Sequence, residues 1–119
     1  MIDDDPITNY LHRMIIEDLN ITDKVEIRTN GEDGMKFLDE FFASGSFPDI
    51  IFLDLKMPVM DGFEFLEACK KSGYPTENVV MLTTSRNPRD IEQMHEWGIK
   101  YLSKPLTKNN LFNVINEHF

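Results

Sequence analysis

The sequence has one cysteine, few basic residues and no long apolar run, and each shortage excludes a class of protein. Cys69 alone cannot form an internal disulfide or a cysteine-built zinc site. The 12 Lys and Arg residues are outnumbered by 21 Asp and Glu residues, giving a formal net charge of −9. This balance argues against direct binding to nucleic acid or to a membrane surface. No stretch approaches the roughly 20 apolar residues of a membrane-spanning helix, and the acidic residues 3–5 are unlike a signal peptide.

The length of 119 residues leaves room for one domain. Hydrophobic residues make up 41% of the chain and charged residues 28%, which is a globular rather than a disordered composition. No repeat, low-complexity tract or linker divides the sequence. We therefore expect a single soluble domain of a reducing compartment, the cytoplasm.

Helix and strand patterns alternate along the chain. Residues 50–53 and 79–82 are apolar at every position, which is typical of parallel strands buried on both faces. Val25 and Ile27 alternate with polar residues and indicate an edge strand, and residues 101–102 indicate a brief last strand. Five helical patterns separate or flank these strands, near residues 6–19, 35–42, 63–69, 88–97 and 107–115. This order predicts an α/β fold around a parallel sheet.

The first helical pattern carries its apolar residues on one stripe. Ile7, Leu11, Ile15 and Leu19 recur at helical spacing, with Met14 beside them.

The first strand of the expected sheet is nearly missing. Only Met1 and Ile2 precede the acidic cluster, and two residues are too few for a central strand. An α/β sheet without a middle strand would leave backbone groups unpaired in its interior. We therefore expect five strands and five helices, with a first strand that is truncated in this sequence. Either residues upstream of Met1 complete that strand or the sheet is compromised there, and we favour the first.

Polar side chains follow the expected strands at their carboxyl ends, where open parallel sheets bind ligands. Asp3 and Asp4 follow the first strand, Asp54 the strand at 50–53, and Thr83 and Lys104 the last two. Each alone could be a helix cap, a strand residue or a loop lysine. Converging carboxylates, however, repel one another unless a cation is present, and a small oxygen-only ligand set suits Mg²⁺. A carboxylate, a divalent cation, a hydroxyl and an ammonium together indicate phosphoryl transfer.

Four stretches resemble the response-regulator receiver domains of two-component signalling, the family of the chemotaxis regulator CheY. They are Ile-Asp-Asp-Asp-Pro at 2–6, Leu-Asp-Leu-Lys-Met-Pro-Val-Met-Asp-Gly at 53–62, Val-Met-Leu-Thr-Thr at 80–84 and Gly-Ile-Lys-Tyr-Leu-Ser-Lys-Pro at 98–105. The resemblance covers essentially the whole chain. It implies a flavodoxin-like, doubly wound (βα)5 fold with a five-stranded parallel sheet in the order 2-1-3-4-5. It also implies a single receiver domain over residues 1–119, without an output domain.

The resemblance implies a phosphoacceptor and a metal site. Asp54 would accept a phosphoryl group from a phosphohistidine of a sensor histidine kinase. Asp4, Asp54 and the backbone carbonyl of Lys56 would bind Mg²⁺ directly, and Asp3 would bind it through a water molecule.

The resemblance also implies a switch beside the phosphoacceptor. Thr83 and Lys104 would bind the phosphoryl group, and Tyr101 would move inward when Thr83 is drawn to it. The bond from Lys104 to Pro105 is typically cis in this family.

Two further positions would tune the lifetime of the phosphate. Lys56 and Ser85 lie two residues beyond Asp54 and Thr83. In the family these positions flank the path of the hydrolytic water. The lysine and serine found here do not predict whether the phosphate is long-lived or short-lived.

The leading hypothesis is a phosphorylation-dependent switch of a bacterial two-component system. It would regulate an unknown output protein through the surface of its fourth helix, fifth strand and fifth helix, roughly residues 88–97 and 101–119. A phosphorelay intermediate that passes the phosphoryl group to a histidine phosphotransfer protein is an alternative. An aspartyl-phosphate phosphatase would need a second acid two residues after the nucleophile, where Lys56 stands. We accordingly expect no enzyme beyond the domain's own phosphorylation and dephosphorylation.

Some reactive residues have ordinary structural explanations. His12, His95 and His118 are scattered without ligand spacing, so we expect no metal site from them. Cys69 falls on a helix face that we expect to be buried, which favours a small core residue over a redox centre. Asp5 is expected to be a helix cap or a neighbour of the acid pair rather than a third metal ligand.

Overall fold

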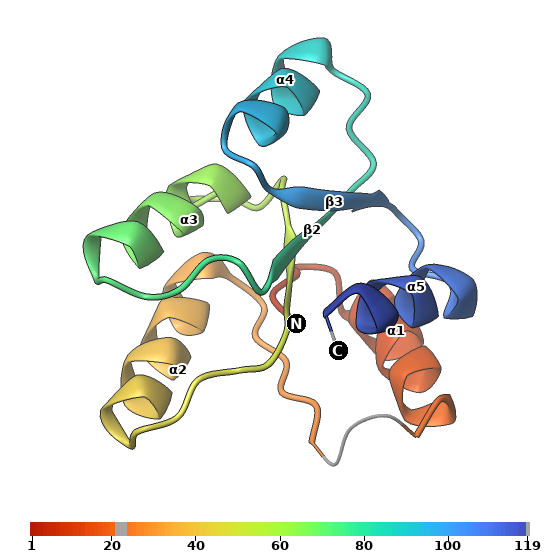
Figure 1. Ribbon diagram of the computed structural model, residues 1–119, viewed down its shortest axis with the longest axis horizontal. Coiled ribbons are helices and arrows are strands. Elements are labelled where there is room, and N and C mark those ends of the chain that lie inside the picture. Colours follow the sequence, from red (N-terminus) through yellow and green to blue (C-terminus); the bar gives the residue numbers. More distant parts are fainter. Residues whose placement is uncertain (21–23, 119) are drawn as a thin grey trace.

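A computed structural model describes residues 1–20 and 24–118 of the chain. Helices and parallel strands alternate after the first two helices, as the sequence predicts. The elements are α1 (Pro6–Asp18), α2 (Gly31–Ala43), β1 (Ile51–Asp54), α3 (Gly62–Lys71), β2 (Val79–Thr83), α4 (Pro88–Glu96), β3 (Lys100–Ser103) and α5 (Lys108–His118). In Figure 1 the strands cross the centre of the molecule, with α1 and α5 on one side and α2 and α3 on the other.

The sheet has two buried faces because β1 is apolar over its first three residues and β2 over its first four, and every residue of both strands is buried. Its order is β1-β2-β3, with all pairs parallel. Leu53 and Met81 belong to a core cluster that also contains residues of α2, α3 and α4. Phe52 and Val80 point the other way, into a second cluster with residues of α1 and α5. The domain is therefore a three-layer α/β/α fold with a core on each side of the sheet.

The expected first strand is reduced to a single bridging residue, Ile2. It forms isolated parallel bridges with Arg28 on one side and Leu53 on the other. The Ile2 N–H donates to the Phe52 carbonyl at 2.8 Å, and the Asp54 N–H donates to the Ile2 carbonyl at 2.9 Å. This rung holds Asp3 and Asp54 side by side at one edge of the sheet.

The predicted strand at Val25–Ile27 is not confirmed, although the segment runs beside the amino terminus: the Met1 amino group donates to the Glu26 carbonyl at 2.7 Å and the Arg28 N–H donates to the Met1 carbonyl at 2.8 Å. That segment has no ladder, and Arg28 alone forms a bridge. A strand needs a partner over several residues, whereas Met1 and Ile2 offer one rung. Three of the five expected strands are present, so the five-stranded order 2-1-3-4-5 is not confirmed, although the bridges of Ile2 follow it at that point.

A cavity of about 400 Å³ lies where the rest of a first strand would run. Its walls include the chain around Val25 and around Ile51, together with the apolar side chains of Ile16, Phe37 and Leu38. The prediction that upstream residues complete the first strand is not tested by the described residues.

Helix α1 buries two polar residues and turns only the carboxyl-terminal part of its apolar stripe toward the core. Asn9, His12 and Ile16 are buried, while Ile7 and Leu11 are 70% and 51% exposed. The spacing predicts a helix correctly but not its orientation, because the layer beneath α1 includes the polar loops of the sheet edge. Two polar residues are therefore buried, and Ile7, Leu11 and Met14 face solvent, whereas Ile15 and Leu19 at the other end of the stripe pack against the core.

The ends of the helices follow local sequence signals. Asp5 caps α1 by accepting a hydrogen bond from the Ile7 N–H, with Pro6 at the first helical position. Asn87 caps α4 in the same way, ahead of Pro88. The cap at Asp5 agrees with the sequence prediction, and both helices begin directly after a loop at the carboxyl edge of the sheet.

Cys69 lies in the core between α2 and α3. It has no exposed surface, and burial, assisted by the nearby Asp39 carboxylate, raises the pKa of its thiol to about 12. Cys69 is thus a core residue, as predicted. Across residues 1–20 and 24–118, none of the helices has the length and apolar character that a membrane crossing requires.

Candidate functional site

Three carboxylates converge at the carboxyl edge of the sheet. Asp3 follows the rung formed by Ile2, Asp4 is its neighbour, and Asp54 is the last residue of β1. One oxygen atom of each lies within 4.8 Å of the others, with Asp3 and Asp54 buried and Asp4 exposed. The sequence prediction that strand ends bring these residues together is therefore correct in geometry.

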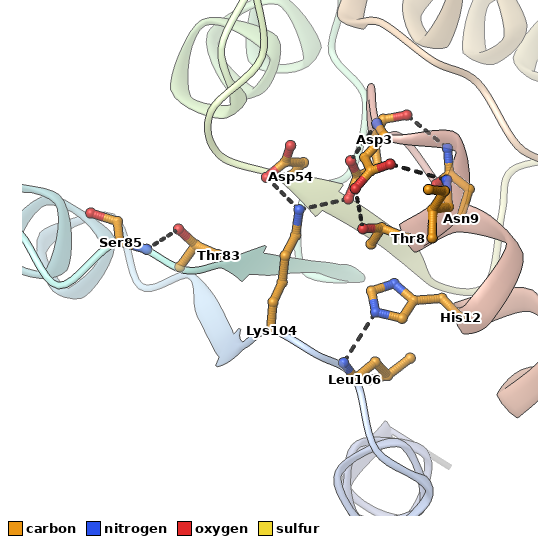
Figure 2. A network of polar contacts seen from close by, with 11 residues as sticks. Asp3, Thr8, Asn9, His12, Asp54, Thr83, Ser85, Lys104 and Leu106 are labelled. Atoms are coloured by element: carbon orange, nitrogen blue, oxygen red, sulfur yellow. Dashed lines mark hydrogen bonds and ion pairs between the residues drawn. The ribbon is translucent and has the colours of Figure 1, made fainter.

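The Lys104 ammonium bridges the two buried carboxylates (Figure 2). Its Nζ lies 2.7 Å from Asp3 Oδ2 and 3.0 Å from Asp54 Oδ1. The residue follows β3, and its backbone N–H donates to the Thr83 carbonyl at 3.0 Å. The Lys104–Pro105 peptide bond is cis. Burial alone would lower the pKa of Lys104, but its bonds to Asp3 and Asp54 raise that pKa above its usual value.

The ionised form of the Asp54 carboxylate is destabilised by its surroundings. Its burial raises the pKa of the carboxyl group to about 6; the hydrogen bond from Lys104 opposes the rise, and the charges of Asp3 and Asp4 add to it. At neutral pH the group is ionised and held close to two other carboxylates.

The raised pKa of Asp54 has a consequence for stability. The folded state holds the Asp54 proton more tightly than the unfolded state, so the ionised carboxylate costs stability above pH 6 and the cost fades as pH falls toward 4. We expect Asp54→Asn to raise the free energy of unfolding of the metal-free protein by about 2 kcal/mol at pH 8, and by less at each step down to pH 4. Urea denaturation followed by Trp97 fluorescence measures this difference.

Glu40→Gln is the control for that experiment, because Glu40 is an exposed carboxylate. Its effect on the free energy of unfolding should stay small across the same pH range. A difference between Asp54→Asn and wild type that does not change with pH would contradict the electrostatic origin.

Thr83 lies at the end of β2, beside the strand that ends in Asp54. The residue is buried, and its Oγ1 accepts a hydrogen bond from the Ser85 N–H at 2.9 Å. Figure 2 shows Thr83 on the same edge of the sheet as Asp54 and Lys104. A hydroxyl is thus available on the strand next to the carboxylates.

Lys56 and Ser85 share one partner, the Asp90 carboxylate of α4. The Lys56 Nζ lies 3.2 Å from Asp90 Oδ2, and the Ser85 Oγ donates to the same oxygen at 2.6 Å. The Ser85 bond and the Lys56 ammonium lower the pKa of Asp90. The two loops that leave β1 and β2 are therefore joined through α4, a contact that sequence reasoning did not predict.

Tyr101 stands apart from the cluster, on β3. Its ring is half-buried and packs edge-to-face against the His95 ring, with the centroids 5.8 Å apart. The structure thus places the expected switch residue between the sheet and α4 rather than among the carboxylates.

Gly62 allows α3 to begin directly against the end of β1. A Cβ at this position would lie 2.9 Å from the Asp54 carbonyl oxygen and 3.0 Å from the Leu55 Cα, both backbone atoms. Its N–H donates to the Leu55 carbonyl at 2.8 Å, and Asp61 caps the helix with a capping box to Glu64. The Asp-Gly pair at 61–62 thus fixes the backbone on which Asp54 is carried.

The donor set fits a hard divalent cation. The three carboxylates offer oxygen atoms only, and exposed Asp4 leaves one side of the group open to solvent. Mg²⁺ prefers few carboxylate ligands and retains several waters. The buried pair Asp3 and Asp54 is held by Lys104, which supplies one positive charge where three negative charges meet.

Two buried polar residues of α1 were missed by sequence reasoning. The Asn9 Nδ2 donates to the Asp3 carbonyl at 2.8 Å, and the His12 Nε2 accepts from the Leu106 N–H at 3.1 Å. A signal was present, because Asn9, His12 and Ile16 share helical spacing. The longer apolar stripe that begins at Ile7 and Leu11 lies on the opposite face and is the stronger pattern.

Comparison with known proteins agrees with this geometry. A family profile described as "Response regulator receiver domain" matches residues 1–116. A crystal structure of a two-component response regulator from Cytophaga hutchinsonii superposes with a TM-score of 0.89 at 34% identity, covering 98% of this chain and 92% of that one.

Curated relatives come from more than one kingdom. A probable C4-dicarboxylate response regulator, DctR, of Halalkalibacterium halodurans is 29% identical over 99% of this chain, which spans 49% of that protein. Two-component response regulator 24 of Arabidopsis thaliana is 25% identical over 98% of this chain and 80% of that protein. The chain thus spans about half of the first relative and most of the second, and the expected bacterial origin does not follow from these matches.

Proposed function

We propose that this chain, which belongs to the response-regulator receiver domain family, is a phosphorylation-dependent switch. Its phosphoacceptor is Asp54. The convergence of Asp3, Asp4 and Asp54 within 4.8 Å, with Lys104 on two of them, is the observation that carries the proposal. The donor would be a phosphohistidine of a sensor histidine kinase or of a histidine phosphotransfer protein.

The chemistry follows from the charges at the sheet edge. An Asp54 carboxylate oxygen attacks the phosphorus of the phosphohistidine, the P–N bond breaks, and its electron pair returns to the imidazole of the donor. The product is an acyl phosphate on Asp54. Lys104 neutralises one phosphoryl oxygen and the Thr83 hydroxyl donates a hydrogen bond to another. Water later cleaves the acyl phosphate to restore the carboxylate and release orthophosphate.

Mg²⁺ is the cofactor that the donor set suits. Asp4, Asp54 and the backbone carbonyl of Lys56 would hold it directly, and Asp3 through water. When bound, it offsets the repulsion among the carboxylates and the phosphoryl oxygens.

Lys56 and Ser85 are the residues we propose to set the lifetime of the phosphate. These two residues belong to the loops that leave β1 and β2, and their shared partner Asp90 fixes both side chains. Tyr101 would turn toward the space left when the Thr83 hydroxyl moves to the phosphoryl group.

The output surface is proposed to comprise α4, β3 and α5, residues 88–97 and 101–118, with Phe119 outside the described residues. We expect acetyl phosphate or beryllofluoride with Mg²⁺ to shift amide NMR signals over this surface. Mass spectrometry of the same sample reports whether Asp54 is phosphorylated. Phosphorylation with unshifted signals across this surface would contradict the output assignment, and no phosphorylation at all would contradict the proposed function.

A phosphorelay remains the second candidate function. It differs in where the phosphoryl group goes next, so transfer from phosphorylated Asp54 to a histidine phosphotransfer protein, faster than hydrolysis, would favour it.

The exposed stripe of α1 is the surface we assign to the phosphoryl donor. Ile7, Tyr10, Leu11 and Met14 are 70%, 64%, 51% and 48% exposed, and the helix begins directly after Asp5 at the acid cluster. A donor protein must bring its histidine to Asp54, so a docking surface has to lie beside that residue. An apolar helical stripe is suited to packing against another helix.

The double variant Tyr10→Ala/Leu11→Ala separates docking from chemistry. We expect transfer from any sensor kinase that phosphorylates wild type to slow by about tenfold or more, because the apolar contact is lost. Phosphorylation by acetyl phosphate, which needs no docking, should stay within about twofold of wild type. Phosphate uptake followed by gel mobility or mass spectrometry measures both rates.

Phe42→Ala provides the matched control, since Phe42 is an equally exposed apolar residue at the far end of α2. Equal slowing by the control, or slowing of both donors by the double variant, would contradict the assignment of α1.

A further inference from the structure

We propose that Asn9 and His12 of α1 are positioning residues for the phosphoryl chemistry. They fix the two loops that carry Asp3 and Lys104, and so set the distance from the Lys104 ammonium to the carboxylates of the site. This inference rests on the proposed function of the site. Neither residue touches the reacting atoms.

The two residues make one buried polar face of α1. They lie three positions apart, where helical side chains are neighbours, and they are 3% and 1% exposed. Polar side chains this deeply buried are costly unless they are hydrogen-bonded. Each makes one hydrogen bond, and in each case the partner is backbone in a loop of the site.

Asn9 holds the acidic loop. Its Nδ2 donates to the Asp3 carbonyl at 2.8 Å, and the bond is buried. The Asp3 side chain on the same residue reaches Lys104 through Oδ2 and accepts the Asp5 N–H through Oδ1 at 3.0 Å. Asn9 thus orients the backbone from which one of the two buried carboxylates projects.

His12 holds the lysine loop across 94 residues of sequence. Its Nε2 accepts the Leu106 N–H at 3.1 Å, and Leu106 is itself buried. Only the neutral ring can accept this bond at Nε2 while carrying its proton at Nδ1, and burial lowers the pKa of His12, which favours that neutral form. Figure 2 shows the imidazole reaching across from α1 to the chain just beyond Lys104.

Burying Asn9 and His12 costs free energy, because, in the described part of the chain, each side chain also has a polar atom without a hydrogen-bond partner. Among the described residues, Asn9 Oδ1 and His12 Nδ1 have no hydrogen-bond partner. A leucine at either position would avoid that penalty but would leave the Asp3 carbonyl or the Leu106 N–H without its side-chain partner. The two loops are otherwise joined to each other through the ion pair of Lys104 with Asp3.

Two amide variants of His12 test the inference. Gln places a carbonyl oxygen near the position of Nε2 and can accept the Leu106 N–H, whereas Asn is one methylene shorter and cannot reach it. With saturating Mg²⁺, we expect His12→Asn to slow phosphorylation by acetyl phosphate, and to weaken beryllofluoride binding, by about tenfold. His12→Gln should stay within about threefold of wild type.

Val79→Ala controls for lost stability. Val79 is buried at the beginning of β2, at the opposite end of the strand from the site. It should lower the urea midpoint, read by Trp97 fluorescence, without slowing phosphorylation. Equal rates for the two His12 variants, or a rate loss in Val79→Ala that matches His12→Asn, would overturn the inference.

Wild-type protein gives a second measurement that does not depend on variants folding. The ¹⁵N signal of His12 Nε2 should shift when beryllofluoride binds, because the loop it holds carries Lys104. An unmoved signal in a sample that binds beryllofluoride would overturn the positioning role alone. Failure of wild type to bind beryllofluoride or react with acetyl phosphate would instead overturn the proposed function beneath it.

Discussion

Asp54→Asn is expected to take up no phosphoryl group from acetyl phosphate or from a sensor kinase, at any Mg²⁺ concentration. The amide keeps the shape of the side chain but its oxygen is a poor nucleophile, so the acyl phosphate cannot form. Neither neighbouring carboxylate is equivalent to Asp54. Asp3 has both oxygens engaged, Oδ2 by Lys104 and Oδ1 by the Asp5 N–H, whereas Asp54 meets Lys104 through Oδ1, and Asp4 is exposed to solvent. Mass spectrometry of the intact protein after incubation measures the result.

Asp4→Asn is the matched control for that loss. It removes a carboxylate from the same cluster but leaves the Asp54 nucleophile intact. Its phosphorylation should fall at low Mg²⁺ and recover as Mg²⁺ is raised, because a missing ligand weakens metal binding without removing the nucleophile. Stable phosphate on Asp54→Asn at the wild-type level would place the phosphoacceptor elsewhere.

Lys104→Met should destabilise the metal-free protein by about 3 kcal/mol, because it leaves two buried carboxylates without their cation. The side chain of Lys104 is 15% exposed, and those of Asp3 and Asp54 are 4% and 8% exposed, so solvent cannot replace the lost charge. Mg²⁺ should recover most of the loss and raise the melting temperature of this variant more than that of wild type. Thermal unfolding with EDTA and with Mg²⁺ measures both effects.

Lys108→Met gives the comparison at the surface. Lys108 pairs with Asp18 at 3.2 Å, but both side chains are more than half exposed. Its loss should cost less than about 1 kcal/mol and should not depend on Mg²⁺. Similar costs for the two variants would show that the ion pairs of Lys104 do not support the metal-free fold.

The carboxyl edge of the sheet could be predicted from sequence because the strands define it. The apolar runs at 50–53 and 79–82 begin and end within one residue of β1 and β2. The residue after a parallel strand points to a known edge, so Asp54 and Thr83 followed from local pattern. The family resemblance added their expected roles.

The orientation of α1 could not be predicted because it depends on what lies beneath the helix. Periodicity locates an apolar stripe but not the layer that it meets. Here the loops carrying Asp3 and Lys104 bury Asn9 and His12, and Leu11 faces solvent. Only Ile15 and Leu19, at the carboxyl-terminal end of the apolar stripe, pack against the core.

The junction at Asp90 was also beyond sequence reasoning. Lys56, Ser85 and Asp90 belong to two loops and a helix, and nothing in their spacing indicates that they share an oxygen atom. Likewise, Val25 and Ile27 have the alternation of a strand, but the chain beside them supplies one rung only. In both cases the outcome depends on a partner distant in the sequence.

The buried thiol of Cys69 makes this protein convenient to label. A maleimide reacts with thiolate, and a fully buried thiol with a pKa of about 12 offers almost none at neutral pH. A cysteine placed at Phe112, which is 56% exposed on α5, would therefore be the reactive one without removal of the native residue. A dye at that position, with the single tryptophan Trp97 as a donor, would report partner binding by energy transfer while the core remains as it is in the wild-type chain.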